Sequence, residues 1–187
     1  STQGYSSAAS DVYKRQIIDT DVIAHEIVEP NSDCLNELVD YFGDSILNDD
    51  KTLNRKKLAS IAFSDKQKTE ALSNITHKYI KAEVVKDINT TDAELVGIDG
   101  AVIIGSNVEP LCEFIVSVIA DKQSRITRIK TRDNITDEQA IQRINAQNDD
   151  EFYKENSMYI IYNNGDIAQL ESDVVVLFNK IKGNSFE

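Results

Sequence analysis

The sequence predicts an α/β fold with a mainly parallel sheet and helices on both of its faces. Segments of strand length alternate along the chain with segments of helical period, as in a sheet built from strand–helix–strand units. The best-defined strand candidates are unbroken apolar runs, which is typical of strands buried on both faces. These runs are AVIIG (101–105), FIVSVIA (114–120) and MYIIY (158–162).

The first predicted strand is short and ends in two closely spaced acids. It consists of IID (17–19), and a helical pattern begins at Val22, with Asp21 placed to cap that helix and Pro30 to end it. Residues 1–16 are rich in serine and alanine and have no sustained period. We therefore interpret them as a disordered or non-native lead.

An all-helical insertion is predicted between the first and second strands, over residues 31–90. One helix follows the cap candidates Asn31 and Ser32 and ends at Gly43. The basic segment LNRKKLASIAF (53–63) forms a short helix. Ser64 and Gln67 have the spacing of a capping box and are predicted to open a long third helix.

Helices are also predicted between and after the later strands. KQSRITRIKTR (122–132) has helical period, and Thr136 and Gln139 form a second capping-box pair that opens the next helix. The turn NNGD (163–166) ends the last strand, and an amphipathic helix covers 170–181.

Composition excludes several classes of protein. The 187 residues carry a net charge of −12 with a pI near 4.6, which argues against nucleic acid as a main partner. No apolar run approaches the roughly 20 residues of a membrane span. Cys34 and Cys112 have no metal-site spacing, so we expect no bound structural metal and a reduced, cytoplasmic protein. A monomer is favoured, although the sequence does not decide the oligomeric state.

Asp19 and Asp21 are candidates for chemistry because they stand at the end of a predicted strand. Parallel sheets bind ligands at the carboxyl ends of their strands. A helix cap explains one acid but does not require two, so a metal or acid–base role is a second interpretation.

A second candidate is the cationic segment KQSRITRIKTR (122–132), with five positive charges and no negative one. Arg125, Arg128 and Arg132 fall on one helix face, and Arg143 follows on the next helix. No acid at helical spacing neutralises this face, which suits a polyphosphate. A solvated surface helix is the alternative.

Other catalytic signatures are weak or missing. The sequence contains no G-x-x-x-x-G-K-[ST] and no G-x-G-x-x-G, and none of its glycines precedes a lysine. His25 is predicted to lie on a polar surface. His77 has no readable acid or serine partner, so core and surface positions both remain open for it.

Several segments, in order, resemble dephospho-coenzyme A kinase, a P-loop enzyme that phosphorylates the ribose 3′-hydroxyl of dephospho-CoA in the last step of coenzyme A biosynthesis. The resemblance extends along nearly the whole chain after residue 16. The segments are IIDTDVIAHEIVEP (17–30), YFG (41–43), LNRKKL (53–58), IAFSD (61–65), ITHKYI (75–80), TRDNITDEQAIQRINAQ (131–147) and YNNGD (162–166).

The chain also departs from the family pattern. Thr20 stands for the usual alanine, His25 for an arginine and Lys78 for a proline. In the run AVIIG, Ala101 replaces a proline and Gly105 a glutamate. The family's first strand and its phosphate loop have no counterpart in the sequence.

The resemblance implies roles for individual residues. Asp21 is the expected general base and Asp19 its companion; Arg55 and His77 are expected to bind dephospho-CoA. Six further residues are expected to form the nucleotide-binding lid and the loop beside adenine: Arg128, Arg132, Arg143, Asn163, Asn164 and Gly165. ATP and Mg²⁺ are the expected cofactors.

The resemblance also implies a domain plan. The kinase core covers 17–30, 91–121 and 152–187, the CoA-substrate subdomain covers 31–90, and the lid covers 122–151. With the central first strand and phosphate loop missing, we expect an N-terminally truncated, inactive fragment. The alternatives are a non-catalytic CoA- or nucleotide-binding relic and another P-loop small-molecule kinase.

Overall fold

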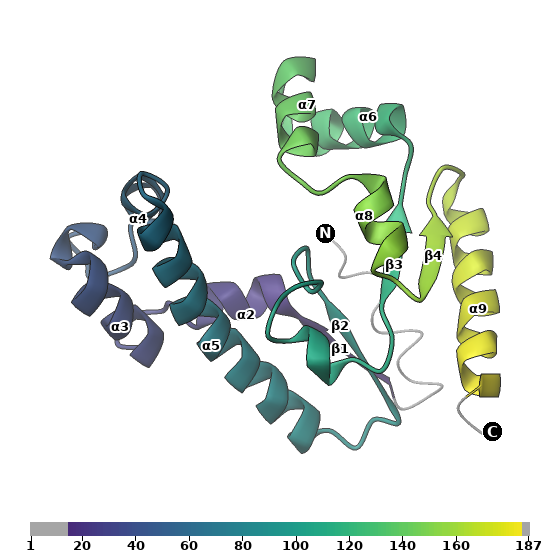
Figure 1. Ribbon diagram of the computed structural model, residues 1–187, viewed down its shortest axis with the longest axis horizontal. Helices are drawn as coiled ribbons and strands as arrows, with labels where there is room; N and C mark the ends of the chain where they lie inside the picture. Colours follow the sequence, from purple (N-terminus) through teal and green to yellow (C-terminus); the bar gives the residue numbers. More distant parts are fainter. Residues whose placement is uncertain (1–14, 185–187) are drawn as a thin grey trace. The chain divides into compact units, whose positions relative to one another are not determined.

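The computed structural model describes residues 15–184 of the chain (Figure 1). The chain divides into two compact units, Ser1–Leu111 and Cys112–Glu187. Each unit contains a pair of parallel strands with helices packed beside it, so the predicted α/β class with parallel strands is confirmed.

The parallel pair of the first unit joins β1 (Arg15–Asp19) to β2 (Leu95–Asp99). The register runs from Arg15 opposite Leu95 to Asp19 opposite Asp99, so both strands end at the same level. β1 begins two residues earlier than predicted, within the segment interpreted as a lead. The rest of that lead, residues 1–14, lies outside the described residues.

The second strand is not the segment that the sequence predicts. AVIIG (101–105) forms turns after β2, and Val102 there is 65% exposed. Gly105 has a φ of +79°, a left-handed conformation that ends any extended run. The segment that pairs with β1 is LVGID (Leu95–Asp99). Its central glycine and terminal aspartate interrupt the apolar pattern, so it is not an apolar run of strand length.

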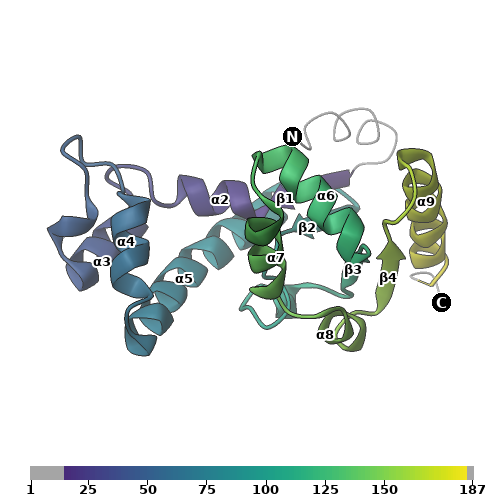
Figure 2. The ribbon, with the colours of Figure 1, turned by 90° about the horizontal axis from the view of Figure 1, so that it is seen from above.

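Four α-helices and two short 3₁₀ turns complete the described part of the first unit. The helices are α2 (Thr20–Glu26), α3 (Asp33–Phe42), α4 (Arg55–Ala62) and α5 (Lys66–Thr90), and the 3₁₀ turns are η1 (Asp44–Ile46) and η2 (Glu109–Leu111). Figures 1 and 2 both show α3 and α4 gathered beside one end of the long helix α5, with α2 leading from them to the strands.

A single apolar core holds these elements together. Ile18 from β1, Ile23 from α2, Leu38 from α3, Leu58 from α4 and Val84 from α5 are all buried members of it. Their burial removes apolar surface from water along each helix, which is the main stabilising term for the unit.

The helix ends confirm some predicted caps and correct others. Ser32 caps α3 by accepting a hydrogen bond from the Leu35 amide, and Gly43 ends that helix with a φ of +83°. The predicted Ser64–Gln67 capping box is wrong. The residue with extended backbone before α5 is Asp65, whose carboxylate accepts from the Gln67 amide, while the Ser64 hydroxyl donates to the carbonyl of Ile61.

The second unit pairs β3 (Val116–Ile119) with β4 (Tyr159–Tyr162), also in parallel. The helices described there are α6 (Lys122–Asp133), α7 (Asp137–Asn145), α8 (Asp150–Glu155) and α9 (Ile167–Asn184). The predicted Thr136–Gln139 capping box is confirmed, whereas α8 has no counterpart in the prediction. The prediction that this strand is buried on both faces is wrong, since Val118 in β3 is 59% exposed.

In the described part of the chain, no helix is long and apolar enough to cross a membrane.

Candidate functional site

The two acids at the end of β1 have different structural roles. Asp19 is the N-cap of α2: one carboxylate oxygen accepts from the amides of Asp21 (2.9 Å) and Val22 (3.1 Å). The prediction that Asp21 caps this helix is therefore wrong. The helix begins directly after the strand, so the last extended residue is Asp19, and Asp21 lies exposed in the first helical turn.

Thr20, between the two acids, ties the start of α2 to the end of β2. Its hydroxyl donates to the backbone carbonyl of Asp99 at 2.9 Å. The next residue, Gly100, leaves room for this contact, because a Cβ there would stand 2.0 Å from the Thr20 Oγ.

Beside these residues the first unit contains a cavity of about 180 Å³. It is bounded by α2, by α5 and by the loop that follows β2. The residues that line it are Thr20, Asp21, Ala24, His77, Ile80, Ala101, Val102, Ile103, Ser106, Asn107 and Val108. The structure thus brings together Asp21 and His77, which the sequence placed in separate motifs.

Three polar groups of this cavity have no hydrogen-bond partner among the described residues. The first two are the carboxylate of Asp21 and the imidazole of His77, and the third is the buried side-chain oxygen of Asn107. The amide nitrogen of Asn107, by contrast, donates to the backbone carbonyl of His77 at 2.9 Å. The Asp21 carboxylate and the His77 imidazole are therefore available to a ligand in a cavity whose other walls are mainly apolar, whereas the Asn107 oxygen is covered by the protein.

Arg55, the other predicted substrate residue, does not line this cavity. It stands exposed at the first position of α4, where its Nη2 donates to the Nδ1 of His25 on α2 at 2.9 Å. Because a guanidinium has no lone pair to offer, Nδ1 is the acceptor and the imidazole proton is on Nε2. The prediction that His25 is exposed is confirmed.

In the second unit, two of the predicted lid arginines meet at one carboxylate. Arg132 binds Asp133 through its Nε (2.7 Å) and Nη2 (3.1 Å), and Arg143 from α7 binds the same carboxylate. Hydrogen bonding from Arg132 is the largest cause that lowers the pKa of Asp133, and the charges of both arginines add to it. The prediction that no acid neutralises the arginine face is therefore wrong. The neutralising acid, Asp133, is adjacent to Arg132 in the sequence and does not lie at helical spacing from it.

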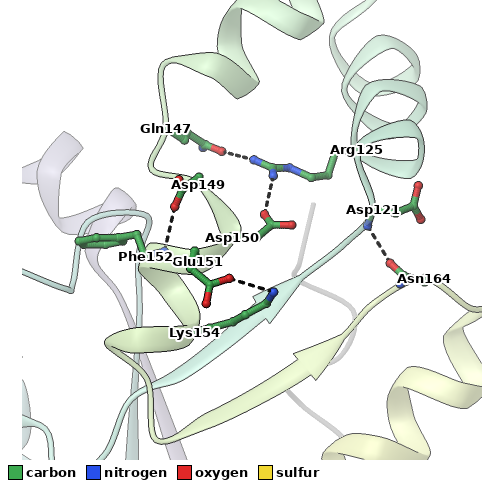
Figure 3. A network of polar contacts seen from close by, with 9 residues as sticks. All are labelled: Asp121, Arg125, Gln147, Asp149, Asp150, Glu151, Phe152, Lys154 and Asn164. Atoms are coloured by element: carbon green, nitrogen blue, oxygen red, sulfur yellow. Dashed lines mark hydrogen bonds and ion pairs between the residues drawn. The ribbon is translucent and has the colours of Figure 1, made fainter.

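Arg125 is also neutralised, by residues that follow α7. Figure 3 shows its guanidinium between the side chains of Asp150 (3.2 Å) and Gln147 (2.9 Å). These side chains belong to the lining of a wider hollow of about 580 Å³, with acids and cations on its walls. Arg128, by contrast, has no salt bridge to any side chain in the described part of the chain, and it is exposed.

The loop after β4 has a clear structural role. The Asn164 side-chain oxygen accepts from the Asp121 amide at 2.8 Å, which joins the ends of β4 and β3 (Figure 3). The Asn163 amide donates to the Ile119 carbonyl at 2.7 Å and prolongs the pairing. At Gly165 a Cβ would meet the Gln169 side chain at 3.3 Å. Asn163 and Asn164 thus fix the carboxyl edge of the β3–β4 pair, and Gly165 gives space to the Gln169 side chain.

No group of three His, Cys, Asp or Glu side chains converges to hold a metal ion among residues 15–184.

Comparison with known proteins decides the family. The model of the family described as dephospho-CoA kinase matches residues 3–169. The chain belongs to the dephospho-CoA kinase family. The match includes most of the Ser/Ala-rich segment that precedes β1, of which residues 3–14 lie outside the described structure.

Relatives that carry the dephospho-CoA kinase name are similar over most of their length. The protein of Lactobacillus johnsonii is 33% identical over 181 residues, covering 94% of this chain and 91% of the relative. That of Listeria monocytogenes serovar 1/2a is 33% identical over 186 residues, covering 97% and 93%. The Saccharomyces cerevisiae dephospho-CoA kinase is 32% identical, covering 92% and 74%.

Solved structures agree with the fold of this family. The dephospho-CoA kinase from Campylobacter jejuni has a TM-score of 0.63 and 26% identity, covering 94% of this chain and 90% of its own. A Thermus thermophilus protein has a TM-score of 0.77 at 22% identity, covering 92% and 86%, which shows a shared fold.

Sequence reasoning missed the loop that closes the cavity. Ser106 and Asn107 belong to no motif, and the strand predicted at 101–105 placed the loop wrongly. A signal was present in Gly100 and Gly105, which bracket the apolar run and mark turns at both of its ends.

Proposed function

We propose that this chain is the substrate-binding and lid portion of an enzyme that phosphorylates the ribose 3′-hydroxyl of dephospho-CoA with ATP. The observation that carries the proposal is the cavity shared by Asp21 and His77. These residues come from two segments of the family pattern, 56 positions apart in the sequence, and they line one cavity at the carboxyl end of β1.

Asp21 is the general base in this proposal. Kinase chemistry on an alcohol needs an acceptor for the hydroxyl proton, and the carboxylate of Asp21 has no competing partner among the described residues. Asp19 serves the reaction indirectly, since its carboxylate caps α2 and so fixes the first turn that carries Asp21. Asp19 is thus a positioning residue.

His77 and Arg55 bind dephospho-CoA in this proposal, at different distances from the reacting hydroxyl. His77 lines the cavity itself, whereas Arg55 lies at the exposed N-terminus of α4 beside His25. A guanidinium at a helix N-terminus suits a phosphate, because both attract the same charge. Arg55 therefore receives the diphosphate of dephospho-CoA.

The lid assignment of the second unit also remains a proposal. Arg132, Arg143 and the exposed Arg128 carry the positive charge for a triphosphate, and the Asn163–Gly165 loop stands at a sheet edge of the kind that binds nucleotides.

The residues of the chain do not by themselves fit ATP and Mg²⁺. A phosphate loop supplies a cradle of amides, a lysine and a magnesium-binding hydroxyl, and the sequence has no G-x-x-x-x-G-K-[ST]. Among the described residues, no group of three His, Cys, Asp or Glu side chains forms a metal cage, so Mg²⁺ would depend on the phosphates of ATP for most of its ligands. We therefore assign no step of phosphoryl transfer to these residues alone.

Each parallel pair of strands also has an edge that no other described strand uses. Within residues 15–184, β2 pairs with β1 alone and β3 pairs with β4 alone. The backbone edge of each pair is open to another strand.

Isothermal titration of the 187-residue chain tests the proposal. We expect dephospho-CoA to bind, and ATP to give neither measurable binding nor phosphorylation of dephospho-CoA. His77→Ala and Arg55→Ala should each weaken dephospho-CoA binding by about tenfold, the effect of losing one charge-assisted hydrogen bond.

Lys56→Ala is the matched control for Arg55→Ala. It removes the same charge from the neighbouring exposed position of α4, so it should leave the affinity nearly unchanged. If Lys56→Ala and Arg55→Ala weaken binding equally, Arg55 acts by general charge and not by a specific contact. Vigorous turnover with ATP would contradict the fragment proposal.

A further inference from the structure

His25 and Arg55 come from different helices and share one hydrogen bond. The Arg55 Nη2 donates to the His25 Nδ1 at 2.9 Å, between residues 30 positions apart in the sequence. A guanidinium has no lone pair to offer, so the contact uses the lone pair of a neutral imidazole. Both side chains are exposed, and neither has a salt bridge to an acid in the described part of the chain. The contact with His25 is therefore what orients the Arg55 guanidinium.

The backbone that carries each side chain is held by the fold. His25 belongs to α2, which is anchored in the core by the buried side chain of Ile23. Arg55 is the first residue of α4, and the amide of the preceding N-cap residue, Asn54, donates to the Ile46 carbonyl at 2.7 Å. The freedom that remains lies in the long side chain of Arg55, and the hydrogen bond to His25 restricts it.

His25 also lies on the same face of α2 as Asp21. The two residues are four positions apart, which places them one above the other on a helix, separated by about 6 Å along its axis. In a ribose 5′-phosphate, the 3′-hydroxyl and the phosphate are likewise joined by only a few bonds of one sugar. A substrate whose 3′-hydroxyl reaches Asp21 therefore brings its 5′-phosphate to the level of the His25–Arg55 pair.

We infer that His25 is a positioning residue for the substrate, which holds the Arg55 guanidinium ready for the phosphate attached to the ribose 5′-oxygen. The inference rests on the proposed function, in which Arg55 binds the diphosphate of dephospho-CoA. An exposed arginine has many rotamers, and ordering them on binding lowers the affinity. A guanidinium that His25 already holds by one nitrogen loses less freedom on binding, and it keeps its other N–H groups for the phosphate.

Two substitutions of His25 separate the acceptor atom from the rest of the side chain. His25→Asn keeps an acceptor oxygen near the place of Nδ1, whereas His25→Phe keeps a ring but presents only C–H groups at its edge. Asparagine and phenylalanine have about the helix propensity of histidine, so α2 should be equally stable in both variants. In isothermal titration of the 187-residue chain, His25→Phe should bind dephospho-CoA about fivefold more weakly than wild type, and His25→Asn within about twofold of it.

A double-mutant cycle with Arg55→Ala shows whether His25 acts through Arg55. In the Arg55→Ala background, His25→Phe should cause no further loss of affinity. The inference alone is overturned by an equal loss in both backgrounds, by no loss in the wild-type background, or by His25→Asn binding as weakly as His25→Phe. If the folded wild-type chain does not bind dephospho-CoA, or Arg55→Ala binds it as tightly as wild type, the proposed function fails and the inference fails with it.

Discussion

Thr20 and Gly100 explain one of the departures from the family pattern at the scale of single residues. Thr20 replaces an alanine, and its hydroxyl reaches the Asp99 carbonyl across the ends of β1 and β2. The space for that hydroxyl exists because residue 100 has no Cβ. The two residues therefore form one structural unit that holds the first turn of α2, and with it Asp21.

This coupling gives a prediction for stability. Gly100→Ala places a Cβ 2.0 Å from the Thr20 Oγ and should lower the free energy of unfolding by about 1–3 kcal/mol, as overpacking does. Thr20→Ala should cost about 1 kcal/mol for its hydrogen bond. In the double variant the clash disappears, so its loss should be smaller than the sum of the two. Urea denaturation measures all three, and strict additivity would show that the two side chains do not interact.

Several site residues could be predicted from the sequence because they belong to segments that resemble the family pattern. Asp21 and His77 were identified from their family segments, and the structure places both on one cavity. Arg55 was grouped with them, yet its contact is with His25. Asn107 could not be predicted, because a single asparagine in a loop carries no pattern, and its importance arises from a carbonyl 30 positions away in α5.

At the scale of elements, the hairpin of α6 and α7 is organised by Asp133. This half-buried carboxylate, 21% exposed, follows Arg132 in sequence and receives Arg143 from the next helix. In the proposed lid, a phosphate group would take the place of this carboxylate between the two arginines. We therefore predict that Asp133 competes with an anion for them.

Replacing this carboxylate should therefore change both stability and anion binding. The pKa of Asp133 is lowered by Arg132 in the folded chain. Its contribution to stability is accordingly present above the ordinary aspartate pKa of about 3.9 and lost as the pH falls through the lower, folded pKa. Asp133→Asn should melt at a lower temperature than wild type at neutral pH, and the difference should shrink as the solution is acidified.

The same variant should bind inorganic tripolyphosphate more tightly than the wild-type chain, because both arginines lose their internal counter-ion. Asp137→Asn is the matched control: it removes an equal charge from the same hairpin, where Asp137 pairs with Lys130 instead. If both variants gain the same affinity in calorimetry, the effect is one of net charge, and Asp133 does not compete for the anion site.

The ends of helices could be predicted where residues close in the sequence determine them. The cap at Ser32, the stop at Gly43 and the Thr136–Gln139 box all lie within one turn of the chain. The strand at 95–99 was missed because its partner, β1, lies about 80 positions earlier, and pairing rather than apolar content makes it a strand. The N-cap of α2 is Asp19 and not the predicted Asp21, because the helix starts directly after β1.

At the scale of the whole molecule, the two parallel pairs are the feature that the family assignment must explain. Among the described residues neither β2 nor β3 has a second neighbour. Open strand edges are sites of self-association, and a two-stranded pair is marginal without further strands. Supplying a further strand to one of these edges should therefore improve stability.

A chimera tests this last step. A strand followed by a G-x-x-x-x-G-K-[ST] loop, joined in frame before β1, should raise the melting temperature and give ATP-dependent phosphorylation of dephospho-CoA, measured by coupled ADP release. The same chimera with its loop lysine changed to alanine is the control. It should keep the added stability, because the strand still pairs, but lose most turnover, because the lysine holds the β- and γ-phosphates. A chimera that is stabilised yet inactive with the intact loop would show that departures within these 187 residues, and not the absent loop, prevent catalysis.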